Sequence, residues 1–405
     1  MSEILRFKDE VEQEDDRFSR FRLMSWWDQA RLRSARVVVI GAGALGNELI
    51  KNLALLGIGN VFVADLDLIE NSNLSRSVLF RAGDRGASKA ETAAARAKDL
   101  FPEIRTRGYH GNVVYDLGLG LYRWADIILG GLDNREARVA VNRAAARVGK
   151  PLIDVAIERL QGVARVFDPA TGPCYECTMS EVDWKLLEAR RSCALLTRDE
   201  MEQGKVPTTP TTSSVIAGIQ AQEAVKLLHG LPVLRGQGFV FDGEHHQSYT
   251  VSYSRRDDCP SHDRDEPVVE LPGYGAATRA GDLLERVRGD LGAEAVLEFN
   301  QDLLCGLHCP RCNQTEPRLA SLGKVKESQA RCPTCGEPRA PEMYHTLDAG
   351  SDLLDRTLGE LGVPAWDVVG GRSGMQVAYY ELLGDRDGVL GELAPTQAAE
   401  GLEFV

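Results

Sequence analysis

Apolar and polar positions along residues 36–167 predict strands and helices in alternation. Short apolar runs predict buried strands, and the longer segments between them carry helix signals. Strands are expected at 36–41, 60–65, 105–110, 126–130, 151–156 and 162–167, and helices near 44–57, 87–101 and 134–148. Strands that alternate with helices in this way predict an α/β fold with a mostly parallel, doubly wound sheet.

Past residue 167 the pattern becomes less regular. A polar stretch over 178–212 contains one helical piece, at 181–190, and a loop of this length is commonly functional. A further helix is expected near 213–229, followed by strands in "GFVFDG" and "SYTVSYS". Near residue 265 the composition shifts, and the remainder predicts helices at 277–290 and 350–361 and strands at 366–370 and 376–383, around a cysteine-rich middle.

These patterns predict three parts. Residues 1–35 form an N-terminal segment, residues 36–264 form the α/β domain with its crossover loop at 178–212, and residues 265–405 form a smaller α+β domain. A chain of 405 residues has ample length for two or three such parts.

Composition narrows the class of partners and the compartment. The formal net charge is -13, which argues against broad nucleic-acid binding because phosphate neutralisation needs a basic face. The acidic start "MSEILRFKDEVEQEDD" does not resemble a signal peptide, and no apolar stretch reaches the roughly 18 residues that a membrane span needs. We therefore expect a cytoplasmic protein without membrane partners, in which clustered cysteines bind metal rather than form disulfides.

The stretch "RVVVIGAGALGNELI" holds a glycine-rich turn between a strand and a helix. Gly41, Gly43 and Gly46 let a phosphate approach the backbone, and the helix points its amide-rich N-terminus at that phosphate. Asp65 ends the second strand about twenty residues later, where a carboxylate binds ribose hydroxyls. The turn alone serves any such phosphate, so these residues also suit a dehydrogenase.

The residues after Asp65 favour a nucleoside triphosphate instead. Asn73 and Arg76 are three apart, Lys89 begins the next helix, and Asp133 follows the strand "ADIILGG". The two cations would stabilise charge on phosphates, and Asp133 would hold Mg²⁺. A nicotinamide site has no need of that charge.

Two sets of cysteines have the spacing of zinc ligands. "GPCYECTM" and "DDCPSHD" provide Cys174, Cys177, Cys259 and His262, and two such pairs can close a tetrahedral site. "CGLHCPRCN" and "ARCPTCGEP" provide Cys309, Cys312, Cys332 and Cys335, in the pattern of a zinc ribbon. We expect two structural zinc ions per chain, with Cys305 and His308 as packing or loop residues.

Seven motifs in order resemble the activating enzymes of ubiquitin-like proteins and the sulfur-carrier adenylyltransferases. They are "RFSR", "GAGALG", "DLD", "NLSR", "GASK", "LDN" and "TTSSVIAGIQAQEAVKLL", and the resemblance covers residues 17 to about 262. It implies a Rossmann-like adenylation domain that binds Mg-ATP, with Asp65 on the ribose, Asn73, Arg76 and Lys89 on the phosphates, and Asp133 on the magnesium. It also implies a homodimer in which Arg20 or Arg17 reaches the partner's ATP, and often a structural zinc at the first cysteine set.

Cys193 belongs to neither zinc set and lies in the crossover loop, where the resembling family carries an acceptor thiol. Arg190 and Arg191 close by would favour the nucleophilic thiolate. We therefore expect ATP-dependent adenylation of the C-terminal carboxylate of a ubiquitin-like protein, then a thioester on Cys193, with Cys305 next in line as the nucleophile. The position of the C-terminal domain alone suggests that it recruits a conjugating enzyme.

Three alternatives remain open. One is a sulfur-carrier adenylyltransferase without an obligatory thioester, which a loop cysteine alone does not separate from the activating enzymes. The second is a non-catalytic scaffold that recruits partners through the ribbon domain, against which the complete set of nucleotide residues argues. The third is a dehydrogenase, the least favoured.

Overall fold

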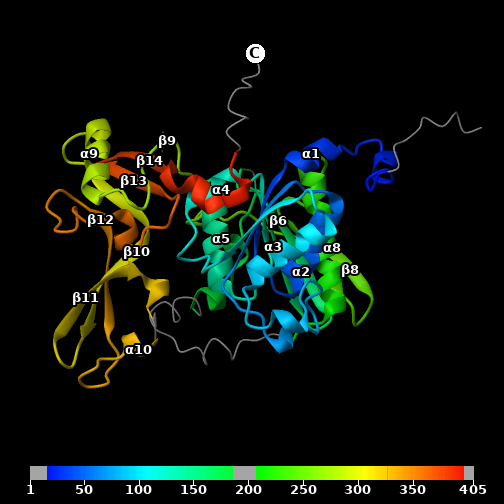
Figure 1. Cartoon of the computed structure of the whole chain (residues 1–405), viewed down its shortest axis with the longest axis horizontal. Helices are drawn as coiled ribbons and strands as arrows, with labels where there is room; N and C mark the ends of the chain where they lie inside the picture. The colour runs from blue at the N-terminus through cyan, green and yellow to red at the C-terminus, as the bar shows by residue number, and fades with distance from the viewer. Residues whose placement is uncertain (1–15, 171, 186–206, 326, 396–405) are drawn as a thin grey trace, which may run out of the picture.

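The computed structural model describes residues 16–170, 172–185, 207–325 and 327–395 (Figure 1).

The first and larger sheet of the protein has eight strands, in the order β3-β2-β1-β4-β5-β6-β7-β8. The strands are β1 (Arg36–Ile40), β2 (Asn60–Asp65), β3 (Arg105–His110), β4 (Ile127–Gly130), β5 (Leu152–Glu158), β6 (Gln161–Phe167), β7 (Gln237–Asp242) and β8 (Gln247–Ser252). Strands β1 to β5 pair in parallel, and β6, β7 and β8 continue the sheet antiparallel. The prediction of a doubly wound, mostly parallel α/β sheet is confirmed.

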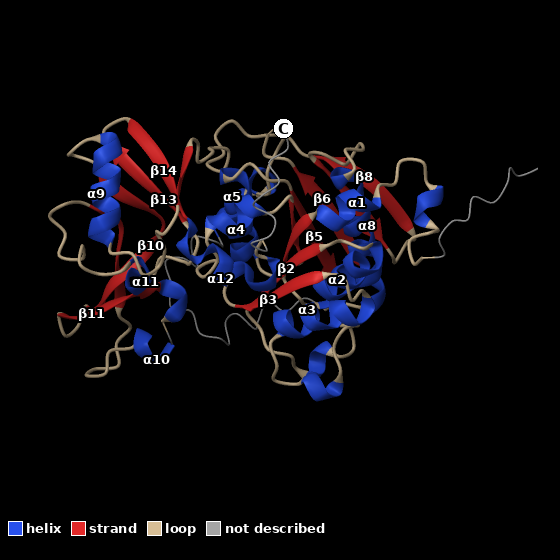
Figure 2. Ribbon diagram, turned by 45° about the horizontal axis from the view of Figure 1, so that its top comes forward, coloured by secondary structure: helices blue, strands red, loops and turns tan. Residues whose placement is uncertain are grey.

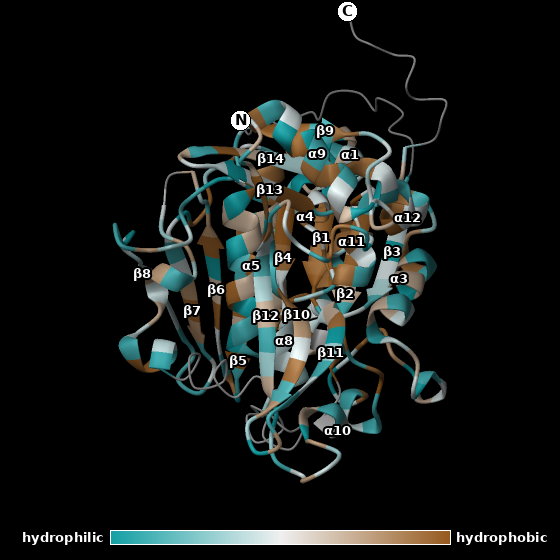
Figure 3. Cartoon of the chain, turned by 90° about the vertical axis from the view of Figure 1, so that its left-hand side faces the viewer, coloured by the Kyte–Doolittle hydropathy of each residue, from teal (hydrophilic) through white to brown (hydrophobic). Residues whose placement is uncertain are grey.

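Helices cover both faces of this sheet. On one face lie α2 (Ala44–Leu56), α3 (Lys89–Leu100) and α8 (Pro210–Leu228), and on the other α4 (Leu119–Trp124) and α5 (Arg135–Arg147). Alternate residues of β1 point to opposite faces, so Val37 and Val39 belong to the first core and Val38 and Ile40 to the second. Burial on both faces explains the continuous apolar runs of the central strands, visible as hydrophobic segments in Figure 3. Helix α1 (Gln29–Ser34) leads into β1.

A second sheet follows in the chain. Strands β11 (Gln314–Ser321), β10 (Val296–Cys309), β13 (Val368–Ser373), β14 (Gln376–Leu382) and β9 (Val268–Leu271) lie in this order, and β12 (Ala340–Leu347) also pairs with β10. Helix α9 (Ala280–Leu291) packs on this sheet through Leu283, Leu284 and Val287. The short helices are α10 (Glu327–Ala330), α11 (Leu358–Leu361) and α12 (Arg386–Leu390).

One expectation for the C-terminal part needs correction. The cysteine-rich middle, for which the sequence predicted no helix or strand, is largely β-structure because β10, β11 and β12 run through it. The helix expected at 350–361 is wrong for most of its length: only Leu358–Leu361 is helical, starting with a capping box between Thr357 and Glu360. Turns that begin at the Asp348 side chain, which accepts from the Gly350 backbone amide at 2.8 Å, precede it. Such local side-chain bonds compete with helix formation.

The two sheets share a buried junction around α4 and α12, which lie between them in Figure 2. Trp366 packs so closely on α4 that a side-chain carbon added at Gly120 would lie 2.4 Å from its ring. The Trp366 indole nitrogen donates to Glu381 at 2.8 Å, and Arg123 of α4 donates to the same carboxylate at 2.8 Å. The second sheet is thus fixed to α4 by packing and by a buried carboxylate. None of the helices described in the structure is both long and apolar enough to cross a bilayer.

Candidate functional site

The glycine turn between β1 and α2 leaves space above the helix N-terminus. Gly41 has φ +97°, a conformation that side chains disfavour, and a carbon added at Gly46 would lie 1.9 Å from the Gly41 carbonyl oxygen. At Gly43, the N-cap of α2, an added carbon would meet no atom within 4 Å. Gly41 and Gly46 are therefore needed for packing within the protein. Gly43 leaves room instead, as a site for a closely approaching phosphate requires.

Asp65 at the end of β2 is oriented toward this turn. Its Oδ2 accepts from the Ala42 backbone amide at 2.6 Å and its Oδ1 from the Asp67 amide at 2.7 Å. Burial raises the pKa of the Asp65 carboxyl, while the Lys89 charge and the two amides act in the opposite direction. The structure thus brings Asp65 to the glycine turn, where the sequence predicted a ribose ligand.

Lys89 is the first residue of α3 and is buried, with 8% of its surface exposed. Its Nζ lies 2.6 Å from Oδ2 of Asp67, and its backbone amide donates to the Asp67 carbonyl at 3.1 Å. Because Asp67 also donates to Asp65, the three residues form one connected group. Asp67 is the last residue of the motif "DLD", and the sequence alone gave no role for it.

Asn73 and Arg76 lie in a turn that follows β2. The Asn73 side chain accepts from the Glu70 backbone amide at 2.9 Å in a capping box, and Arg76 Nη1 donates to the Ser72 carbonyl at 2.7 Å. Arg76 is partly exposed. Both side chains thus stabilise their own turn, and their binding of phosphate stays a prediction.

Buried Asn47 connects the glycine turn to the chain at Leu79, three residues after Arg76. Its Nδ2 donates to the Ala42 carbonyl at 2.6 Å, and its Oδ1 accepts from the Leu79 amide at 2.9 Å. Asn47 was not among the predicted site residues, although a polar residue on a largely apolar helix face was a signal for it.

Asp133 follows β4 on the same edge of the sheet. The Gly131 amide donates to the Ile40 carbonyl at 2.8 Å, so the start of this loop lies beside Gly41. Asp133 is exposed, and among the described residues its carboxylate has no hydrogen bond or ion pair. A free carboxylate at this edge suits Mg²⁺, which takes oxygen ligands.

The two candidate arginine fingers differ in their contacts. Arg17 Nη2 donates to the Leu100 carbonyl at 2.6 Å, and its guanidinium lies 5.0 Å from the centre of the Phe101 ring. Arg20 is exposed and makes no comparable side-chain contact with the described part of the chain. Arg20 is therefore the one whose charge is available to another molecule.

The first cysteine set converges at the base of the crossover segment. The Cys174 sulfur lies 3.8 Å from that of Cys177 and 3.5 Å from that of Cys259, and Cys177 Sγ lies 3.3 Å from His262 Nε2. Sulfur ligands at about 2.3 Å from a tetrahedral zinc ion are about 3.8 Å apart, so this donor set fits zinc. Disulfide bonds are much shorter.

The second set converges at the far end of β10. Cys309 and Cys335 sulfurs are 3.6 Å apart, and those of Cys312 and Cys332 are 3.9 Å apart. In each set all four ligand atoms lie within 4.8 Å of one another, so the second set fits a closed zinc site as well. Cys305 is separate, and its thiol donates to the Glu342 carbonyl at 3.2 Å. Burial raises the pKa of the Cys305 thiol, which disfavours the thiolate.

Cys193, Arg190 and Arg191 lie outside the described residues. The start of their segment is described: residues 181–185 are helical, and Asp183 forms an ion pair of 3.0 Å with Arg135, the first residue of α5. This ion pair holds the start of the crossover segment, at Asp183, against the first turn of α5. Arg135 follows Asp133 by two residues in the chain.

Comparison with known proteins identifies relatives of the first part of the chain. Residues 16–261 match the ThiF family. The chain is 35% identical over 260 residues to the SAMP-activating enzyme E1 of Haloferax volcanii, which covers 60% of this chain and 87% of that protein. It is 33% identical over 254 residues to the sulfur carrier protein adenylyltransferase of Thermus thermophilus, which covers 61% of this chain and 89% of that protein.

Among solved structures, Escherichia coli MccB with ATP is similar. The TM-score is 0.52 at 24% identity, over 62% of this chain and 75% of MccB. This likeness shows a shared fold. Together with the family match, it confirms the resemblance that the seven motifs carried.

Proposed function

The chain belongs to the ThiF family, and on that premise we propose that it uses ATP to adenylate the C-terminal carboxylate of a ubiquitin-like or sulfur carrier protein. The observation that carries the proposal is the arrangement of three groups along one edge of the first sheet. Gly43 leaves the N-terminus of α2 open, Asp65 is an oriented carboxylate, and Asp133 is a free carboxylate. A scaffold without activity would not need that combination.

In the proposed reaction a carboxylate oxygen of the partner attacks the α-phosphorus of ATP, an acyl-adenylate forms, and pyrophosphate leaves. Asp65 holds the ribose hydroxyls, and Asn73, Arg76 and Lys89 hold the phosphates. Magnesium, when bound at Asp133, would neutralise charge on the phosphates. A homodimer in which Arg20 reaches the partner protomer's nucleotide would complete the site.

For the second step we favour transfer of the acyl group to Cys193. Its thiolate attacks the acyl carbon of the adenylate, a thioester forms, and AMP leaves with the electron pair. The relatives include both an enzyme named as an E1 and a sulfur carrier adenylyltransferase, at 35% and 33% identity, so the second branch stands equally as an alternative. In that branch the adenylate passes to a sulfur donor without an obligatory thioester.

Isotopic exchange between pyrophosphate and ATP tests the first step, with small ubiquitin-like proteins of the same organism as substrates. Exchange should require one of these proteins and Mg²⁺, and Asp133→Ala should abolish it while the circular dichroism spectrum stays unchanged. Calorimetry that finds NAD bound more tightly than Mg-ATP would refute adenylation.

A gel test then decides the second step. Cys193→Ala should keep exchange but lose the covalent adduct with the partner, and in the wild type a reducing thiol should release that adduct. Cys305→Ala is the matched control and should keep the adduct. An adduct that persists in Cys193→Ala would place the nucleophile elsewhere, and exchange with no adduct in the wild type would favour the sulfur-carrier branch.

A further inference from the structure

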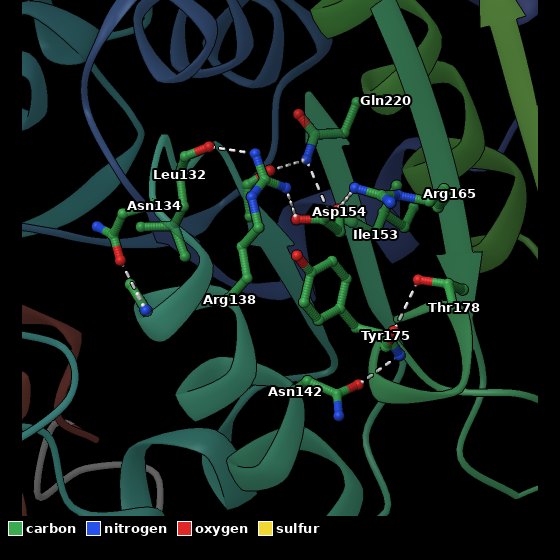
Figure 4. Close-up of polar contacts among 12 residues, drawn as sticks. Leu132, Asn134, Arg138, Asn142, Ile153, Asp154, Arg165, Tyr175, Thr178 and Gln220 are labelled. Carbon is green, nitrogen blue, oxygen red and sulfur yellow. Dashed lines mark hydrogen bonds and ion pairs between the residues drawn. The ribbon is translucent and has the colours of Figure 1, made fainter. Parts of the chain in front are cut away.

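Buried Arg138 of α5 holds the backbone that carries Asp133. Its Nη1 donates to Oδ1 of Asp154, and its Nη2 donates to the carbonyl of Leu132, the residue directly before Asp133 (Figure 4). Arg138 has only 7% of its surface exposed, and Asp154 has 3%. One planar guanidinium thus connects the loop after β4 to a carboxylate on β5, the neighbouring strand.

A second buried side chain holds the start of the same loop. Gln220 of α8 donates through Nε2 to the carbonyls of Gly130, at 3.0 Å, and Ile153, at 2.9 Å. After the loop, Asn134 caps α5 by accepting from the Ala137 amide at 2.8 Å. The backbone is therefore fixed before and after Asp133.

The charges of this group exceed what one carboxylate can neutralise. Arg165 donates to the other oxygen of Asp154 at 2.5 Å, and its guanidinium lies 5.2 Å from the centre of the Tyr175 ring. Two guanidinium groups thus share one buried carboxylate. Buried ion pairs are weak sources of stability, because desolvation offsets their attraction. Apolar residues could fill this space, but only a forked donor reaches both Asp154 and the Leu132 carbonyl.

We propose that Arg138 is a positioning residue for the metal-binding step, which fixes the Asp133 carboxylate where Mg²⁺ bound to ATP can reach it. The inference rests on the proposed role of Asp133 in the function above. Arg138 itself touches neither nucleotide nor metal in this proposal. Its effect should therefore appear only in the part of ATP affinity that depends on Mg²⁺.

Calorimetry of the full chain with ATP, once in Mg²⁺ and once in EDTA, measures that part directly. In the wild type Mg²⁺ should tighten ATP binding, and Asp133→Ala should remove the gain. The ATP affinity of Arg138→Met should fall at least about tenfold in Mg²⁺ and change less than about twofold in EDTA. Arg165→Met is the matched control, since Arg165 shares Asp154 but does not contact Leu132, and it should keep most of the gain.

The double variant Arg138→Met with Asp133→Ala separates positioning from general damage to the fold. In Mg²⁺ it should bind ATP about as tightly as Asp133→Ala alone, because the two changes act through one carboxylate. If Arg138→Met does not fold, Arg138→Lys serves instead: it keeps the charge but replaces the two-nitrogen fork by a single nitrogen, so it should lose part of the gain.

Several results would overturn the inference. One is a full magnesium gain in Arg138→Met, or in Arg138→Lys where that variant replaces it. Another is an equal loss of ATP affinity with Mg²⁺ and with EDTA. The third is weaker ATP binding in the double variant than in Asp133→Ala. In these cases Asp133 can still bind the metal. A wild type that binds ATP without any magnesium gain would overturn the proposed role of Asp133, and this inference with it.

Discussion

The ammonium of Lys89 lies 2.6 Å from the carboxylate of Asp67, and the two side chains differ sharply in exposure: 10% for Lys89 and 59% for Asp67. The cation proposed to bind phosphate is thus held by a carboxylate that faces solvent. A phosphate that reaches Lys89 has to approach this negative charge or take its place.

Replacing Asp67 with asparagine should therefore tighten ATP binding in the absence of Mg²⁺. Removing one exposed like charge near the phosphates is worth about 1 kcal/mol, or roughly fivefold in Kd. Calorimetry in EDTA measures the change. Asp99→Asn, which removes an exposed carboxylate at the other end of α3, is the control and should leave the Kd unchanged. Weaker binding in Asp67→Asn would show that the carboxylate orients Lys89 productively.

Because Arg17 and Arg20 lie in different surroundings, replacing Arg17 should lower stability and replacing Arg20 should lower activity. Arg17→Ala loses the hydrogen bond to Leu100 and the contact with Phe101, so it should lower the free energy of unfolding by about 1 kcal/mol. Arg20→Ala should leave stability unchanged and reduce pyrophosphate exchange. Thermal unfolding and exchange assays on both variants check this.

Mixed dimers extend the test of Arg20. A protomer with Arg20→Ala and one with Lys89→Ala should together recover part of the exchange activity, because one of the two composite sites would be complete. Heterodimers confirmed by mass that show no recovery would contradict a finger acting between protomers.

The sequence sufficed for the parts of the fold that depend on local patterns. Apolar runs such as 36–40 mark strands buried on both faces, and the glycine spacing marks the turn beside them. The convergence of both cysteine sets was also predictable, because ligand pairs with two residues between them form knuckles in many contexts. Within each pair and each of the other patterns, the signals lie within a few residues of one another in the chain.

Contacts between distant segments could not be predicted in the same way. Arg138 and Asp154 are sixteen residues apart, and their pairing depends on α5 packing beside β5. The strands of the cysteine-rich middle were missed because polar residues and prolines interrupt their alternation, and their pairing with β10 defines them. The helix expected at 350–361 failed for a local reason, since the Asp348 side chain favours a turn.

The two cysteine sets predict two zinc ions per chain with separable roles. Elemental analysis should find two in the wild type and in Cys305→Ser, whose thiol belongs to neither set, and one in Cys309→Ser. Pyrophosphate exchange should persist in Cys309→Ser, because every residue proposed to bind the nucleotide lies before residue 134, in the part of the chain that forms the first sheet and its helices. Two ions in Cys309→Ser would exclude its sulfur as a ligand.

The last prediction concerns Asp367, at the junction between the two sheets. Its Oδ1 accepts from the Leu119 amide at the start of α4 at 2.8 Å, and Asn300 donates to the same carboxylate at 3.1 Å. Burial raises the pKa of Asp367 to about 6 from 3.8, although the nearby Arg147 charge acts in the opposite direction.

Because the folded state binds this proton more tightly than the unfolded state, the stabilising contribution is complete below pH 4. This contribution, at most about 3 kcal/mol, is lost as the pH rises through about 6. Asp367→Asn cannot take up this proton. The wild-type free energy of unfolding minus that of Asp367→Asn should therefore fall between pH 4 and pH 6 and stay constant above pH 7. Guanidinium denaturation of both proteins across this range measures the difference, and loss of zinc at low pH affects both proteins alike. Parallel curves would show that Asp367 remains ionised in the folded protein throughout.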